Sequence, residues 1–108
     1  MKYKMTSQVN ELLKVVKQSL SIVQTSTAKD EEIKMWISAA ISDMERQGIA
    51  VLDNIQDCLV QGAITLYAKS NFGFIDIKEK ELAEKSYKQL CNNLSLSSDY
   101  QPEVEINA

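Results

Sequence analysis

Apolar residues recur every three or four positions along most of this chain, which is the spacing of one face of an α-helix. The first such pattern predicts a helix over residues 7–20, with Thr6 or Ser7 as its N-cap. Serine and threonine dominate residues 19–27, which predicts a connection in which Val23 should still pack inward. The apolar stripe of this first helix consists of Val9, Leu12, Leu13, Val16 and Leu20.

The clearest helical pattern covers residues 28–47. Three consecutive acids fall in its first turn and Arg46 in its last, where each charge suits the helix macrodipole. Gly48 then fits a left-handed C-cap, with Ile49 folding back as its hydrophobic contact. The predicted stripe, in which Trp36 is a core anchor, consists of Ile33, Trp36, Ile37, Ala40, Ile41 and Met44.

A third helix is predicted over about residues 55–71, capped by Asp53 or Asn54 and ending at Asn71 and Gly73. Apolar residues cover most of its circumference, so we expect it to be buried on most sides and to lie at the centre of the fold. The residues of this helix expected to be largely buried are Leu59, Ala63, Leu66 and Tyr67, together with Trp36, Ile37, Ile41, Tyr87 and Leu90 elsewhere.

A short apolar run, Phe72, Phe74 and Ile75, follows outside any helix. These side chains either fold back onto the core or form an exposed apolar loop that contacts a neighbouring subunit. A fourth helix is predicted over about residues 78–94, with an outer face of lysines and glutamates that is typical of a solvated surface. Its inward residues are Leu82, Ala83, Ser86, Tyr87, Leu90, Cys91 and Leu94.

Beyond Leu94 the residues are mostly polar, and residues 103–107 alternate polar and apolar like a short strand. Such a segment is either frayed or pairs with something outside the domain. The chain therefore predicts an all-α fold: a small bundle of about four helices with a polar, partly extended C-terminal tail. Residues 1–100 would form one helical domain and residues 101–108 a flexible or partner-ordered tail.

The composition of the chain argues against several classes of function. The 108 residues carry a net charge of −3 and a single arginine, Arg46, which argues against tight binding to nucleic acid. Neither a signal peptide nor an apolar run long enough to span a membrane is present. Cys58 and Cys91 fall on apolar faces and should be buried thiols, and without histidine they cannot form the usual closed zinc site. With no phosphate-binding loop and no nucleophile beside a base, we expect no enzyme activity, no cofactor and no metal.

Three segments carry a resemblance to a known family. They are the run Leu-Tyr-Ala-Lys-Ser-Asn-Phe-Gly at residues 66–73, Lys85-Ser86-Tyr87, and Leu-Ser-Leu-Ser-Ser-Asp-Tyr at residues 94–100. The acid-capped helix that ends at Gly48 adds to them. Together they resemble the small head-tail connector proteins of long-tailed bacteriophages, also called adaptor or head-completion proteins, which act in DNA packaging. The resemblance covers about residues 9–100.

This resemblance implies a helical, non-enzymatic virion protein, assembled in the cytoplasm of the host bacterium. It implies a homo-oligomeric ring of about a dozen copies beneath the portal protein, with closed cyclic symmetry. DNA would pass through the ring without sequence-specific binding, and the ring would dock the next head-completion or tail protein. The alternative is a small helical protein-binding or regulatory module. Besides the first helix, the candidate subunit or portal contacts are Phe72, Phe74, Ile75, Tyr100, Val104 and Ile106.

Overall fold

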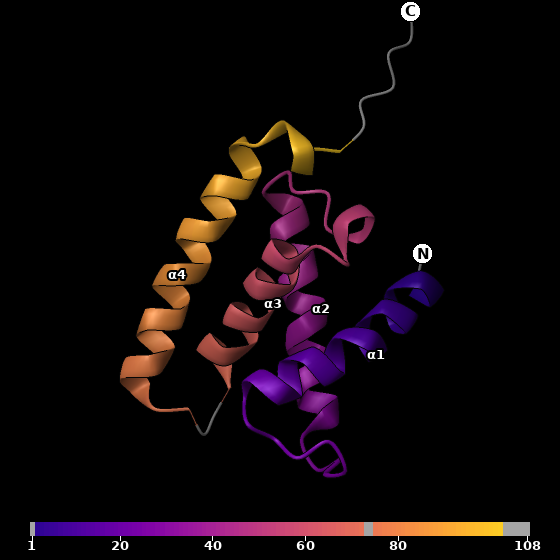
Figure 1. Ribbon diagram of the computed structural model, residues 1–108, viewed down its shortest axis with the longest axis vertical. Helices are drawn as coiled ribbons and strands as arrows, with labels where there is room; N and C mark the ends of the chain where they lie inside the picture. The colour runs from indigo at the N-terminus through magenta and orange to yellow at the C-terminus, as the bar shows by residue number, and fades with distance from the viewer. Residues whose placement is uncertain (1, 73–74, 103–108) are drawn as a thin grey trace, which may run out of the picture.

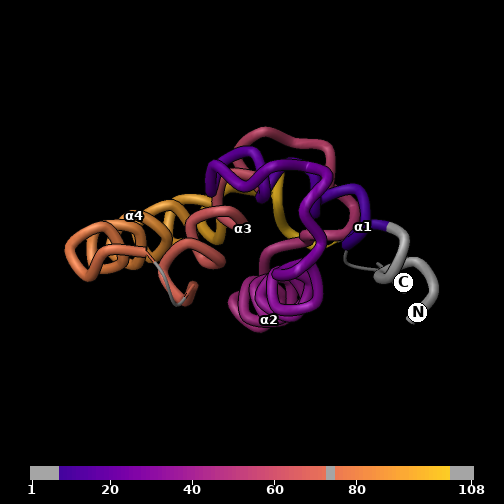
Figure 2. Tube along the Cα trace, turned by 90° about the horizontal axis from the view of Figure 1, so that it is seen from below, coloured from indigo at the N-terminus to yellow at the C-terminus, as the bar shows by residue number. Residues whose placement is uncertain are grey.

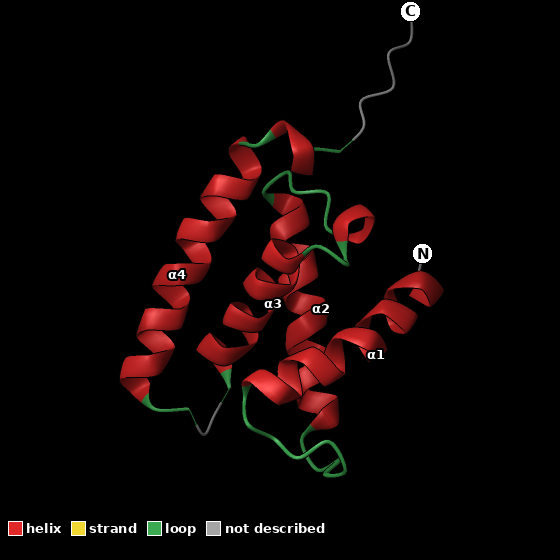
Figure 3. Ribbon diagram, in the orientation of Figure 1, coloured by secondary structure: helices red, strands yellow, loops and turns green. Residues whose placement is uncertain are grey.

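A computed structural model describes residues 2–72 and 75–102, and their side chains from Gln8 onward; within these ranges every regular element is a helix (Figures 1 and 3). The prediction of an all-α bundle of four helices is therefore confirmed. In chain order, the elements are α1 (Lys2–Ser19), α2 (Asp30–Arg46), the 3-10 turn η1 (Leu52–Asn54), α3 (Cys58–Asn71), α4 (Ile77–Leu96) and the 3-10 turn η2 (Ser98–Tyr100).

Helix α3 lies at the centre of the bundle, as predicted. It contacts α1, α2 and α4, and Figure 2 shows it between α4 on one side and α1 and α2 on the other. The core is built from the inward stripes of all four helices. Its largest fully buried apolar side chains include Leu12, Ile33, Ile37, Ile41, Met44, Ile64, Phe72 and Leu94.

Helix α1 begins at Lys2, before the predicted caps, because residues 2–5 include nothing that opposes a helix. At its other end, Ser21 adopts a left-handed conformation with φ 61°. The backbone N–H of Ile22 donates to the carbonyl of Lys17, and that of Ser21 to the carbonyl of Gln18. These two bonds form a Schellman motif, so a serine occupies the position that glycine usually takes.

The predicted end of α2 is confirmed. Gly48 has φ 87°, and the N–H of Ile49 donates to the carbonyl of Met44 at 3.1 Å. Ile49 is 1% exposed, so it makes the expected hydrophobic contact. Trp36 is only half buried, and its ring lies 6.4 Å from that of Tyr67.

Helix α3 begins three residues later than predicted. Residues 52–54 form the separate turn η1, and the N-cap of α3 is Asp57. The Asp57 carboxylate accepts hydrogen bonds from the backbone N–H groups of Leu59 (2.8 Å) and Val60 (3.3 Å). The helix ends at Asn71 as predicted, but the next residue, Phe72, is extended with ψ 130°.

Four residues predicted to face inward are exposed instead. Leu59 is 50% exposed, Leu82 65% and Val23 67%, and Cys58 is also exposed. On α3 the inward stripe is Val60, Ala63, Ile64 and Ala68, and on α4 it is Ala83, Tyr87, Cys91 and Leu94. A residue adjacent in sequence to such a stripe points about 100° away from it. The neighbouring helices cover too little of the circumference of α3 and α4 to bury these adjacent residues as well, so Leu66, Tyr67 and Leu90 are only half buried.

Candidate functional site

The candidate contact residues lie at two ends of the molecule. Phe72 is 1% exposed, so its ring folds back onto the core, which is the first of the two alternatives given for this loop. Ile75 packs partly against the core next to it. Tyr100 lies at the other end of α3, beside its N-cap Asp57. Phe74, Val104 and Ile106 lie outside the described residues. The structure therefore does not bring the loop and Tyr100 together (Figure 1).

Tyr100 fastens the last described turn to the rest of the bundle. Its hydroxyl donates to Asp57 Oδ2 at 2.9 Å, and its carbonyl accepts from the backbone N–H of Ala50 at 2.6 Å. The hydrogen bond from Tyr100 lowers the pKa of Asp57 below its usual value, and the same bond raises the pKa of Tyr100. Tyr100 thus holds η2, the last described turn, beside the N-terminus of α3.

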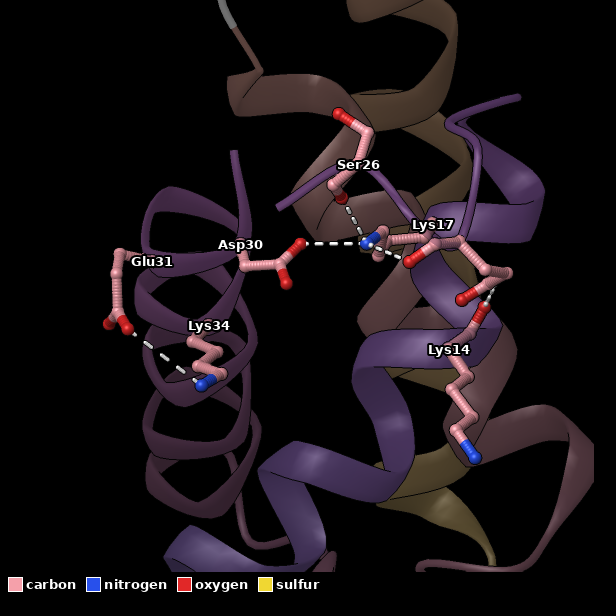
Figure 4. A network of polar contacts seen from close by, with 7 residues as sticks. Lys14, Lys17, Ser26, Asp30, Glu31 and Lys34 are labelled. Carbon is pink, nitrogen blue, oxygen red and sulfur yellow. Dashed lines mark hydrogen bonds and ion pairs between the residues drawn. The ribbon is translucent and has the colours of Figure 1, made fainter. Parts of the chain in front are cut away.

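Sequence reasoning missed Lys17, which is 2% exposed and is the anchor of the connection between α1 and α2. Its ammonium group donates to the carbonyls of Gln24 (3.0 Å) and Ser26 (2.5 Å) and pairs with Asp30 Oδ1 at 2.8 Å (Figure 4). A sequence signal existed: residue 17 continues the apolar stripe, four positions after Leu13. A charge on a buried stripe indicates a buried partner.

A second polar contact, which is partly buried, lies beside the aromatic ring of Tyr67. The hydroxyl of Tyr87 donates to Asp43 Oδ2 at 2.6 Å, and its ring lies edge-on to that of Tyr67 with centroids 5.1 Å apart. Burial, followed by the bond to Asp43, raises the pKa of Tyr87 far above its ordinary value, and burial raises the pKa of the Cys91 thiol. Both groups stay protonated near neutral pH, so neither has the reactivity of an activated base or nucleophile.

A shallow groove of about 400 Å³ runs between α1 and α3 on the surface of the bundle. Its wall is mainly apolar, which the predicted burial of α3 on most sides did not anticipate. The residues that line it are Val15, Ser19, Cys58, Gln61, Gly62, Thr65 and Leu66.

The part of the chain that the structure describes gives no support for a metal site or a membrane-spanning helix. It contains no group of three or more side chains that could hold a metal ion. None of the helices, as far as they are described, has the length and hydropathy needed to cross a membrane.

Comparison with known proteins identifies the family. Searches of the curated proteins and of the solved structures gave no significant match. A sequence model for the family described as "Phage connector protein" matches residues 12–101, which include all of α2, α3, α4 and η2. This match covers most of the chain and agrees with the resemblance drawn from its motifs. The chain therefore belongs to the phage connector protein family, a structural and non-enzymatic family of the phage particle.

Proposed function

We propose that this protein is a head-tail connector subunit that forms a ring of about a dozen copies beneath the portal of a filled capsid. The ring extends the DNA channel and docks the next head-completion or tail protein. It is assembled in the cytoplasm of the host bacterium and remains in the virion at the head-tail interface. The observation that carries this proposal is the family match over residues 12–101.

The placement of the candidate contacts supports a ring. A closed ring requires each subunit to present two different surfaces, one to each neighbour. The loop after Phe72 and the turn at Tyr100 lie at opposite ends of α3, whose 14 residues span roughly 21 Å. We assign the subunit or portal contacts to Ile75 at one end and Tyr100 at the other, together with Phe74, Val104 and Ile106, which lie outside the described residues.

The charge of the chain supports a channel through which DNA slides. Binding to the phosphate backbone requires clustered lysine and arginine side chains that displace counterions. The net charge is −3, and Arg46 pairs with Asp43 at 3.4 Å on its own helix. A ring of such subunits would let the DNA duplex pass without binding it tightly.

The first experiment measures the mass of the protein by light scattering or native mass spectrometry, alone and with the portal protein of the same phage. We expect a discrete complex with the portal oligomer, in which the bound copies form a closed ring. Ile75→Ser should weaken this complex, whereas Leu82→Ser, at an exposed site on α4, is the matched control. Failure of the wild-type protein to bind the portal would contradict the proposal.

A second experiment separates the connector from the alternative, a small protein-binding or regulatory module. The gene is removed from the phage, and the particles are examined by electron microscopy. A connector is needed after packaging, so we expect DNA-filled or leaking heads that fail to join tails. Normal yields of tailed, infectious particles would exclude the connector role.

A further inference from the structure

The outward side of α3 faces the open groove between α1 and α3 in the described part of the chain. Cys58, Gly62 and Leu66 follow one another at intervals of four residues, so they lie along one side of the helix, opposite to its inward stripe. They form the α3 wall of the groove, and Val15 lines it from α1. The residues that line this groove are all uncharged.

Gly62, in the middle of this side, has no role that a single copy of the chain explains. Glycine inside a helix destabilises the helix relative to alanine. The φ angle of Gly62 is not positive, and a Cβ atom added there would meet no atom within 4 Å. Neither backbone conformation nor packing within the described chain therefore requires glycine at this position. Glycine does allow a second backbone to approach this side of α3 closely.

The polar side chains that α3 contributes to the groove already bond within the chain. The hydroxyl of Thr65 donates to the carbonyl of Gln61 at 2.9 Å. The side-chain amide of Gln61 in turn donates to the carbonyl of Ile55 at 3.1 Å. Another protein surface can therefore cover the groove without leaving these two side chains without a hydrogen-bond partner.

Charges of opposite sign lie beyond the two ends of the groove. Glu11 lines an adjoining pocket that shares two lining residues with the groove, and its carboxylate accepts a hydrogen bond from Gln56 at 3.3 Å. Lys69 follows Gly62 by two helical turns, on the same side of α3 but outside the groove. Within the described residues, neither Glu11 nor Lys69 takes part in an ion pair. Gln56 precedes Gly62 by six residues and Lys69 follows it by seven, so the acid and the base flank Gly62 on opposite sides.

We propose that this face, the groove with Glu11 and Lys69 beyond its ends, pairs two copies of the chain about a two-fold axis at Gly62, with their α3 helices antiparallel. A residue on such an axis meets its own copy, so a charge there would meet a like charge, whereas the groove is neutral. The antiparallel arrangement places Lys69 of each copy beside Glu11 of the other. The face is thus complementary to itself, which favours a second copy over an unrelated partner. The contact uses none of the residues assigned above to subunit or portal contacts, and it does not depend on ring formation.

Sedimentation velocity of the full chain over a wide range of concentrations measures this association. The face is small, so we expect a monomer–dimer equilibrium with a micromolar Kd. Gly62→Lys should raise the Kd about a hundredfold or more, because it places two ammonium groups at the axis. The open space around Gly62 allows this variant to fold, which circular dichroism checks. Gly62→Ala is the neutral control and should raise the Kd much less.

Charge reversal tests the antiparallel pairing. Lys69→Glu and Glu11→Lys should each raise the Kd about tenfold, because the two-fold axis turns one change into two repulsive contacts. An equimolar mixture of these two variants should recover the wild-type Kd, since every acid in the mixed dimer again lies beside a base. Lys85→Glu is the matched control, because it changes the net charge equally at an exposed site on α4, and it should leave the Kd unchanged.

Several outcomes would overturn the proposal. One is a wild-type protein that stays monomeric at every concentration. Another is a species larger than a dimer that Gly62→Lys abolishes, which would assign the face to ring contacts. A third is a monomer whose binding to the portal protein is blocked by Gly62→Lys, which would assign the face to a different partner. Failure of the mixture to recover the wild-type Kd would exclude the antiparallel arrangement. Failure of the wild-type protein to bind the portal contradicts the proposed function alone.

Discussion

Replacement of Lys17 by methionine should destabilise the fold more than any other change at a lysine within the described part of α1. Methionine keeps the length of the side chain but removes its charge and its three donors. In the wild-type protein, these donors serve Asp30 and the carbonyls of Gln24 and Ser26. The substitution leaves a carboxylate that is only 18% exposed without its cation and two carbonyls without their donor.

The size of the effect follows from these contacts. Removal of one partner of a buried ion pair costs about 3–5 kcal/mol. Asp30 keeps some contact with solvent and lies in the first turn of α2, where the macrodipole favours a negative charge. We therefore expect a loss near the lower limit, about 3 kcal/mol in the free energy of unfolding. A domain of this size is stable by about 5–15 kcal/mol, so the variant should still fold.

Urea unfolding, followed by circular dichroism, measures the difference. Lys14→Met is the matched control, because Lys14 lies one turn earlier on α1 with an exposed side chain that points away from Lys17 and its partners (Figure 4). It should change the stability by less than about 0.5 kcal/mol. Combining Lys17→Met with Asp30→Asn should cost less than the sum of the two single changes, with a coupling of about 0.5–3 kcal/mol. Equal costs for Lys17→Met and Lys14→Met, or no coupling, would refute the reasoning.

Four further predictions use the same structure. Ser21→Gly should raise the stability by about 0.5–1 kcal/mol in urea unfolding, because glycine adopts φ 61° without strain, and a loss would contradict the Schellman motif. Ile37→Ala should cost about 2–5 kcal/mol and Leu59→Ala less than about 1 kcal/mol, because only Ile37 is fully buried; equal costs would place Leu59 in the core. Tyr100→Phe should raise the pKa of Asp57 measured by NMR titration. Because the folded-state pKa of Asp57 is lowered, Asp57 stabilises the fold above its unfolded pKa, and this contribution is lost as pH falls through the folded pKa. Tyr100→Phe should therefore lose less stability than the wild-type protein over that acidic range. Finally, duplex DNA should bind more weakly than a Kd of about 1 µM at physiological salt, and tighter binding in a filter or anisotropy assay would conflict with the net charge of −3.

The sequence by itself determined the secondary structure and the family. Helical spacing predicted all four helices, and the end of α2 at Gly48 was correct because only local backbone geometry decides it. The family could be read from motifs for the same reason: the segments that carry the resemblance are continuous in the chain, and the family match covers them.

The tertiary structure decided which apolar residues are buried and where the contact residues lie. Leu59 and Ile37 look alike in the sequence, yet one is half exposed and the other fully buried, because neighbouring helices cover only part of α3. Likewise, the partners of Lys17 and Tyr100 lie on other elements, at sequence separations that no periodicity reveals. Burial and long-range hydrogen bonds depend on how helices pack against one another, whereas a periodic pattern reports only which side of a single helix a residue is on.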